Sequence, residues 1–238
     1  MTLPFWESRA IYVVRAGSHA YGTNLPASDE DTRGVCIPPP EYLIGLKRWQ
    51  VYRDAEQDRT IYSLHHYVGL AMSNNPQTLE ILHVREKDIL HITPLGCRLR
   101  EAAPLFLSKR LGHAASGIAN QHVKTLQDRN SSRHGKHREL IDRYGYDVKD
   151  AAHVIRTMRL AIEAMATGVV NTYRPDRDEL RDILAGGRSF ERVLAEVERL
   201  HDEIAAALAL STLPDEPNFE AVNTLVMDLH RRALEGFL

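Results

Sequence analysis

The pattern of apolar and polar positions changes period once along the chain, near residue 93. Before that point, short apolar runs alternate with turns rich in glycine, proline and aspartate, which is the pattern of β-strands. Such runs predict strands over residues 11–15, 32–37, 51–52, 58–62 and 89–92. Between the last two runs, apolar residues recur at helical spacing after Ser63, a residue type that favours the N-cap of a helix. The first part of the chain is therefore predicted to mix strands with helices.

The rest of the chain, from Pro94 onward, shows helical periodicity only. Its apolar stripes are interrupted at Gly168 and again at Pro214, residue types that end helices. We expect an α+β fold in which a small mixed sheet backed by helices is followed by an all-α region. The predicted domains are residues 1–93 and residues 94–238.

Composition is that of an ordinary water-soluble protein. Of the 238 residues, 43% are hydrophobic and 26% are charged. No apolar run approaches the roughly 20 residues that a membrane span needs, so no membrane partner is expected. The N-terminus lacks the basic start and apolar core of a signal peptide, and Cys36 and Cys97 are too few for a disulfide framework. We expect a cytoplasmic protein, and no feature of the sequence predicts an oligomeric state.

The net charge of −2 does not by itself demand a polyanionic partner, but the charge is unevenly distributed. The segment Leu107–Arg143 carries eight lysines or arginines against three acids. Such a local excess can bind phosphate groups, as in an RNA backbone. It is equally typical of a solvated helical surface with a polar loop. Both interpretations are open on composition alone.

A Gly-Ser pair and two aspartates form the first candidate site. Gly17 and Ser18 follow the first predicted strand, and Asp29 and Asp31 lie at the second. Since side chains two apart in a strand share a face, we expect the two carboxylates side by side. Like charges this close repel unless a cation lies between them, and Mg²⁺ binds through carboxylates, water and phosphate. Gly17 permits a tight turn, Ser18 offers donors to phosphate oxygens, and the stretch therefore predicts a site for metal and triphosphate.

A third acid would allow a second metal ion and hence a two-metal phosphoryl transfer. Asp58 is the candidate, because it begins the strand predicted over residues 58–62, where a sheet neighbour of the Asp-x-Asp strand is expected. Asp54 and Glu56 are the alternatives if Asp58 lies too far from the first two acids.

These motifs resemble the signature of the DNA polymerase β-like nucleotidyltransferase superfamily, in which a Gly-Ser precedes an Asp-x-Asp. Longer strings resemble one branch of it, the predicted nucleotidyltransferases that include RNA-ligase-associated RNA-repair proteins; these strings are GSHAYG, SDEDTRG, DRTIYSL, NNPQTLEIL and YDVKDAAHVIR. The resemblance extends from about residue 17 to about residue 187. Glu30 and Thr32 depart from the apolar residues that the superfamily often has after each acid, but they suit the narrower branch.

The resemblance implies a nucleoside triphosphate, such as ATP, as substrate and one or two Mg²⁺ ions, or Mn²⁺, as cofactor. Carried over residue by residue, it implies a phosphate-contacting pair, Gly17 and Ser18, and three catalytic, metal-binding acids, Asp29, Asp31 and Asp58. It also implies that the helical region, residues 94–238, packs on the nucleotide site.

Four further residues are candidate nucleotide contacts. Arg33 either orients the acids or contacts phosphate. On the helix predicted after Asp147, Lys149, His153 and Arg156 are spaced four and three apart and therefore share one face. Spacing alone slightly favours a solvated basic face, whereas the resemblance of YDVKDAAHVIR favours contacts that neutralise triphosphate charge.

The sequence thus predicts an Mg²⁺-dependent nucleotidyltransferase that moves a nucleoside monophosphate onto an acceptor hydroxyl and releases pyrophosphate. An RNA 3′ end, bound through Leu107–Arg143, is the expected acceptor, which would place the protein in RNA repair. A protein side chain or a small molecule is an alternative acceptor. A nucleotide-binding regulatory or antitoxin-type module with the same fold is the alternative of another class.

Overall fold

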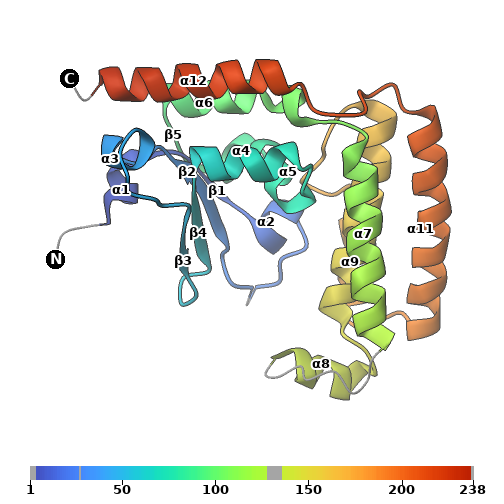
Figure 1. Ribbon diagram of the computed structural model, residues 1–238. Coiled ribbons are helices and arrows are strands. Elements are labelled where there is room, and N and C mark those ends of the chain that lie inside the picture. Colours follow the sequence, from blue (N-terminus) through green and yellow to red (C-terminus); the bar gives the residue numbers. More distant parts are fainter. Residues whose placement is uncertain (1–3, 27, 128–135, 237–238) are drawn as a thin grey trace. The chain divides into compact units, whose positions relative to one another are not determined.

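The computed structural model describes residues 4–26, 28–127 and 136–236 (Figure 1). The chain forms two compact units. One unit consists of Met1–Leu107 together with Glu216–Leu238, and the other consists of Ser108–Asp215. Strands occur only in the first unit among the described residues, so the expected α+β class is confirmed.

A five-stranded mixed sheet is the centre of the first unit. Its strands are β1 (Ala10–Arg15), β2 (Thr32–Cys36), β3 (Val51–Asp54), β4 (Arg59–Ser63) and β5 (Ile89–Ile92), in the spatial order β3-β4-β2-β1-β5. The β2 and β4 pair is parallel, with Thr32 opposite Arg59, and the other neighbours are antiparallel. All five predicted strands are present, and each lies within about two residues of its predicted limits.

Short helices connect and cover these strands. They are α1 (Phe5–Arg9), α2 (Gly17–Tyr21), α3 (Pro40–Leu43), α4 (Leu64–Met72), α5 (Pro76–Leu82), η1 (Glu86–Asp88), α6 (Pro94–Glu101) and η2 (Ala103–Phe106). Ser63 caps α4 as predicted, because its hydroxyl accepts a hydrogen bond from the backbone N–H of His66. The phenol of Tyr12, fully buried under the helices, donates to the carbonyl of Ile81 at 3.1 Å. The sheet is thereby fixed to α5.

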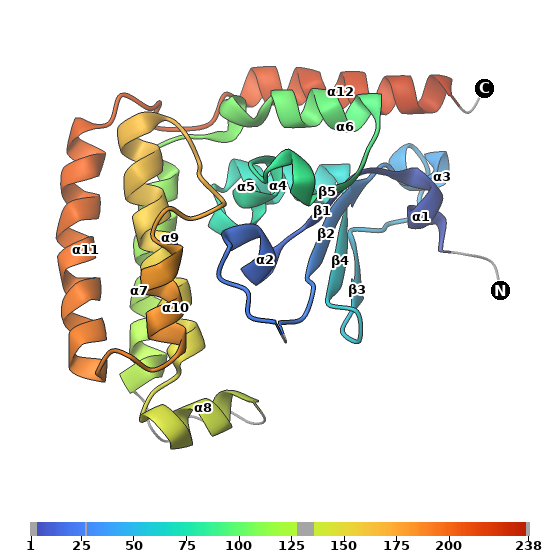
Figure 2. The ribbon, with the colours of Figure 1, turned by 180° about the vertical axis from the view of Figure 1, so that it is seen from behind.

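The last helix, α12 (Phe219–Glu235), belongs to the first unit although it is far away in the sequence. Both views show it beside α6 (Figures 1 and 2). An ion pair joins the two helices, with Arg98 Nη2 at 2.7 Å from Asp228 Oδ2. The units therefore differ from the predicted domains of residues 1–93 and 94–238: the boundary falls after Leu107, and the chain returns at Glu216.

The second unit is entirely helical in its described part. Its helices are α7 (Arg110–Gln127), α8 (Lys136–Tyr144), α9 (Val148–Thr167), α10 (Arg177–Leu184) and α11 (Phe190–Leu210). The long helix α9 packs against the other four. It begins at Asp147, whose carboxylate accepts hydrogen bonds from two backbone N–H groups, and it ends at Gly168 with a φ of 72°. The predicted end at Gly168 is therefore confirmed, because glycine adopts this conformation without strain.

Candidate active site

The Gly-Ser pair begins helix α2 directly after β1, where the predicted turn lies. Gly17 has a φ of +59°, a conformation that costs other residues roughly 1 kcal/mol or more. A Cβ atom added to Gly17 would overlap the carboxylate of Asp31. Both the backbone turn and the close approach of the Asp31 carboxylate therefore require glycine at position 17. The contact with Asp31 also places the Gly-Ser pair next to the Asp-x-Asp motif.

Asp29 and Asp31 precede strand β2 and do not lie on it. The prediction that strand alternation puts the two carboxylates on one face is therefore wrong in its premise, since β2 begins at Thr32. Another contact holds the acidic segment: the backbone N–H of Ala16 donates to the carbonyl of Asp31 at 2.8 Å. The segment is an extension of the β1–β2 pairing beyond the end of the sheet.

Asp58 lies in the turn between β3 and β4 with a φ of +43°, an uncommon conformation that aspartate tolerates better than most residues. The parallel register places Thr32 opposite Arg59, so the residues before them, Asp31 and Asp58, lie at the same end of the sheet. The carbonyl of Asp58 accepts a hydrogen bond from Thr32 N at 3.0 Å. The third acid is therefore held next to the first two by the backbone.

Mutual repulsion is visible in the electrostatics of Asp31. Burial raises the pKa of its carboxyl above the usual value, and the charges of Asp58 and Asp29 raise it further. Arg33 and His19 oppose this shift. The carboxylate oxygens of the three acids are nevertheless not all within 4.8 Å of one another. Among the described residues, the side chains that do come this close together lie in the second unit.

Arg33 is engaged within the acidic cluster. Its Nη1 donates to the carbonyls of Thr32 and Asp58 at 3.0 and 2.9 Å, and its Nη2 lies 3.4 Å from Asp31 Oδ1. Of the two roles predicted for Arg33, these contacts favour orienting the acids. Asp54, an alternative third acid, has its Oδ1 bound by the backbone N–H groups of Glu56 and Gln57 and serves the hairpin turn instead.

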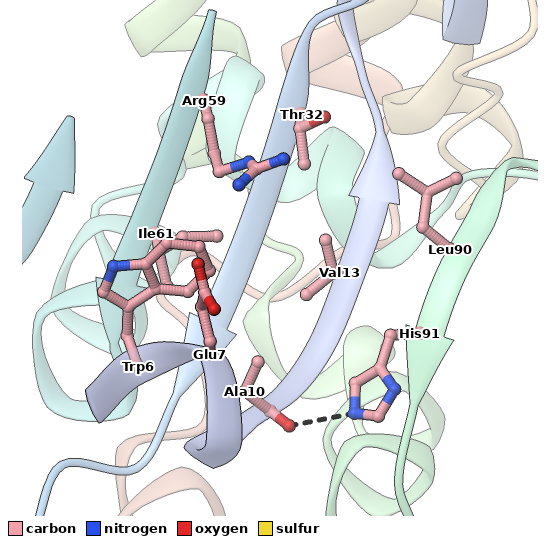
Figure 3. A pocket seen from close by; sticks show the side chains of 9 residues that line it. All are labelled: Trp6, Glu7, Ala10, Val13, Thr32, Arg59, Ile61, Leu90 and His91. Carbon is pink, nitrogen blue, oxygen red and sulfur yellow. Dashed lines mark hydrogen bonds between the residues drawn. The ribbon is translucent and has the colours of Figure 1, made fainter. Parts of the chain in front are cut away.

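A hollow of about 290 Å³ lies on one face of the same sheet (Figure 3). Its lining comes from α1 and four strands: Trp6, Glu7, Ala10, Val13, Thr32, Arg59, Ile61, Leu90 and His91. Successive side chains of a strand point to opposite faces, so Arg33 is directed away from this hollow. None of the three acids lines it. The hollow and the acidic cluster are thus separate features of the first unit.

Comparison with known proteins identifies the class of this site. The model of a family described as the RNA repair pathway DNA polymerase beta family matches residues 6–228.

The chain belongs to this family.

Other similarities are weaker. An uncharacterized 38.9 kDa protein from the nrdC-mobD intergenic region of Enterobacteria phage T4 is 32% identical over 78 residues, which cover 28% of this chain and 23% of that protein. The match thus spans less than a quarter of the phage protein. A nucleotidyltransferase-like protein from Exiguobacterium sibiricum 255-15 is similar over 84% of this chain and 68% of its own, with 13% identity and a TM-score of 0.29. That TM-score is too low to establish a shared fold.

The family is one of polymerase β-type nucleotidyltransferases. The acids of this chain fit the divalent metal that such chemistry uses, because three carboxylates are a hard oxygen donor set. Burial raises the pKa of Asp31 most and the charges of Asp58 and Asp29 add to it, so a bound cation would stabilise the ionised carboxylate. In the described part of the chain, no helix is long and apolar enough to cross a membrane.

Three residues that were predicted to contact nucleotide lie in the second unit, on α9. Lys149 is exposed, whereas Arg156 is buried with its Nη2 at 3.3 Å from His153 Nδ1. Burial, together with the nearby Arg156 and His122, lowers the pKa of His153 to about 3, although Asp150 opposes the shift. The expectation that His153 adds positive charge is therefore wrong at neutral pH. Residues 128–135 of the basic segment Leu107–Arg143, with Arg129 and Arg133 among them, lie outside the described residues.

Polar contacts around α2 were not evident from the sequence. The Tyr21 hydroxyl donates to Glu80 Oε2 at 3.0 Å, and Glu80 is only 3% exposed. Arg15 pairs with Glu30, between the two acids, and its Nη1 lies 3.8 Å from the buried Asp88. Glu80 lies in an apolar stretch of α5. A charged residue flanked by core residues is seldom buried without a polar partner, so this pattern could have indicated a contact such as the one with Tyr21.

Proposed function

We propose that this protein transfers a nucleoside monophosphate from a nucleoside triphosphate to an acceptor hydroxyl, with Mg²⁺ or Mn²⁺ bound at Asp29, Asp31 and Asp58. The acceptor oxygen forms a bond to the α-phosphorus, the bond to the bridging oxygen breaks, and pyrophosphate leaves. The observation that carries the proposal is the convergence of three acids and the Gly17 turn at one end of the sheet.

Each side chain has a role that follows from its place. Asp29 and Asp31 hold the divalent ion, which supplies neutralisation of the charge that develops on the phosphate oxygens. Ser18, at the start of α2, donates its hydroxyl to a terminal phosphate oxygen. Asp58 accepts the proton of the attacking hydroxyl, a role that needs an ionised carboxylate. Arg33 keeps Asp31 and Asp58 in register by binding both.

An RNA 3′ end is the proposed acceptor. The support is the description of the family, which places it in an RNA repair pathway, and the excess of basic residues over Leu107–Arg143. An RNA backbone is attracted to such a segment by its phosphate charges. The proposed place of action is the cytoplasm.

The test is a labelling experiment with the full chain. Each α-³²P-labelled nucleoside triphosphate is incubated with the protein, Mg²⁺ and a pool of RNA with free 3′ hydroxyls. We expect label on RNA, release of pyrophosphate, and loss of both in the Asp29→Asn variant. A parallel pool with 3′-phosphate ends should remain unlabelled, because the attacking hydroxyl is blocked.

The other outcomes separate the alternatives. Label on the protein itself or on a small molecule would move the acceptor away from RNA but keep the transferase. No labelled product and no pyrophosphate, with equal nucleotide binding by the wild type and the Asp29→Asn variant, would contradict the proposal and favour a nucleotide-binding regulatory or antitoxin-type module.

A further inference from the structure

A second group of metal-binding side chains lies in the helical unit. One donor atom each from His137, Asp147 and Asp150 lies within 4.8 Å of the other two. A fourth donor is adjacent: His122 Nδ1 on α7 lies 3.4 Å from Asp150 Oδ2. The four side chains come from three elements, α7, α8 and the N-terminal end of α9.

We propose that His122, His137, Asp147 and Asp150 bind one first-row transition metal ion of the Zn²⁺ class. This site is distinct from Asp29, Asp31 and Asp58, and the inference does not rest on the proposed function. It would join α8 and α7 to the start of α9.

The separation of His122 from Asp150 fits a small ion, but His122 is not part of the group whose donor atoms are all within 4.8 Å of one another, so it would have to move closer to His137 and Asp147. Two ligands of a tetrahedral Zn²⁺, each about 2.0–2.2 Å from the metal, lie roughly 3.4 Å apart. His122 Nδ1 and Asp150 Oδ2 already have this separation. His137 Nδ1 lies 2.5 Å from Asp147 Oδ2, and the His137 side chain is 51% exposed, so it is free to rotate by the small amount that an ion requires.

The remaining donors are already fixed for metal binding. Asp147 Oδ1 accepts hydrogen bonds from the backbone N–H groups of Lys149 and Asp150, which leaves Oδ2 directed at His137. Such hydrogen-bonded carboxylates are oriented ligands. The Nδ1 atom of His122 is buried and has no hydrogen-bond partner in the described part of the chain, although it is directed at a carboxylate. A metal ion would satisfy it.

The ligand types define the class of ion. Two imidazoles and two carboxylates suit Zn²⁺, Co²⁺ and other transition metals, whereas Mg²⁺ and Ca²⁺ prefer oxygen ligands alone. A divalent ion would also compensate the two carboxylates at the start of α9. We therefore expect Zn²⁺ and Co²⁺ to bind here and Mg²⁺ to leave the group empty.

The test uses the Asp29→Asn/Asp31→Asn double variant, in which the first acidic cluster no longer competes. Zn²⁺ is titrated by calorimetry, and Co²⁺ is followed by its visible absorption. We expect one equivalent to bind, and the affinity to fall by more than about tenfold, the cost of losing even an outer-shell partner, when His137→Ala or His122→Ala is added. His113→Ala, an exposed histidine of α7, is the matched control and should leave binding unchanged.

The variants must also remain folded. Asp147→Asn is therefore included, because asparagine keeps the helix cap while it removes the charged ligand, and it should weaken Zn²⁺ binding like His137→Ala. Melting curves of the metal-free variants serve as the folding control. Failure of the double variant to bind Zn²⁺, or binding that His137→Ala and Asp147→Asn leave unchanged, would overturn the site. Binding that only His122→Ala leaves unchanged would overturn the assignment of the fourth ligand.

Discussion

Two groups of carboxylates, one in each compact unit, are in opposite electrostatic situations. The pKa of Asp31 is raised, first by burial and then by the charges of Asp58 and Asp29. Asp147 is 1% exposed, yet two backbone N–H groups and His137 bind its two oxygens. The same side chain is thus poorly compensated in the first group and well compensated in the second.

The difference indicates what each group is for. A protein gains nothing in stability from acids that repel each other, so such crowding is typical of a site that awaits a cation and a substrate. A carboxylate that caps a helix contributes to stability by itself, and a metal ion adds to that contribution. This contrast fits the roles proposed above, a catalytic one for the first group and a structural one for the second.

The largest expected effect concerns the third acid of the first group. Asp58→Asn should lower kcat by roughly 10²- to 10⁴-fold, the range for loss of a general base. Asp54→Asn is the matched control, because Asp54 lies in the same hairpin and caps its turn, and it should change kcat only a few-fold. Steady-state nucleotidyl transfer at saturating triphosphate measures both. Equal losses in the two variants would mean that the hairpin matters and that Asp58 has no special role.

The second prediction tests the close contact between the glycine turn and Asp31. Gly17→Ala should destabilise the protein by about 1–2 kcal/mol, because its φ is positive, and by more if the Asp31 carboxylate cannot move. Gly69→Ala is the control: Gly69 lies in helix α4, a Cβ there meets no atom within 4 Å, and a gain of about 0.5–1 kcal/mol is expected. Urea unfolding measures both. A neutral Gly17→Ala would contradict the contact.

The third prediction concerns the compensated group. With metal removed by a chelator, Asp147→Ala should cost about 1 kcal/mol through loss of the helix cap, and Asp147→Asn should cost less. Thermal melting in the chelator measures the difference. If alanine and asparagine were equally destabilising, charge at this position would matter more than the cap, and the assignment of Asp147 as a satisfied acid would fail.

The smallest effect is the pH dependence that Asp31 imparts. Its pKa is raised on folding, so the folded state binds more protons than the unfolded state between the ordinary value near 3.9 and the raised one. The free energy of unfolding therefore falls as pH rises through that window. Without metal, Asp31→Asn should be more stable than the wild type at pH 7, and this advantage should shrink at pH 4. If Asp31→Asn were less stable than the wild type at pH 7, the carboxylate of Asp31 would be well compensated, contrary to the comparison between the two groups.

Local features of the fold were predictable from the sequence. Alternation and breaker residues located all five strands, and the cap at Ser63 was correct because it depends only on neighbouring residues. The return of α12 to the first unit was not predictable. Its apolar stripe indicates a buried face but not the partner, which depends on the Arg98–Asp228 contact across a long sequence separation.

The candidate site was predictable as a set of residues but not as a geometry. The Gly-Ser and Asp-x-Asp spacing selected the acids, yet alternation placed Asp29 and Asp31 on a strand that begins only at Thr32. The positive φ of Asp58 could not be expected, since aspartate adopts many turn conformations. His153 was predicted to be a cation because spacing does not reveal burial, which holds it neutral.

The central claim is that Asp29, Asp31 and Asp58 hold the catalytic metal while the helical unit holds a different one. Anomalous diffraction from crystals grown with Mn²⁺ and a non-hydrolysable nucleoside triphosphate tests it most directly. We predict a manganese peak bound by Asp29 and Asp31, with Asp58 directly or through water, and a terminal phosphate at Ser18. A triphosphate and manganese bound away from these acids would contradict the claim.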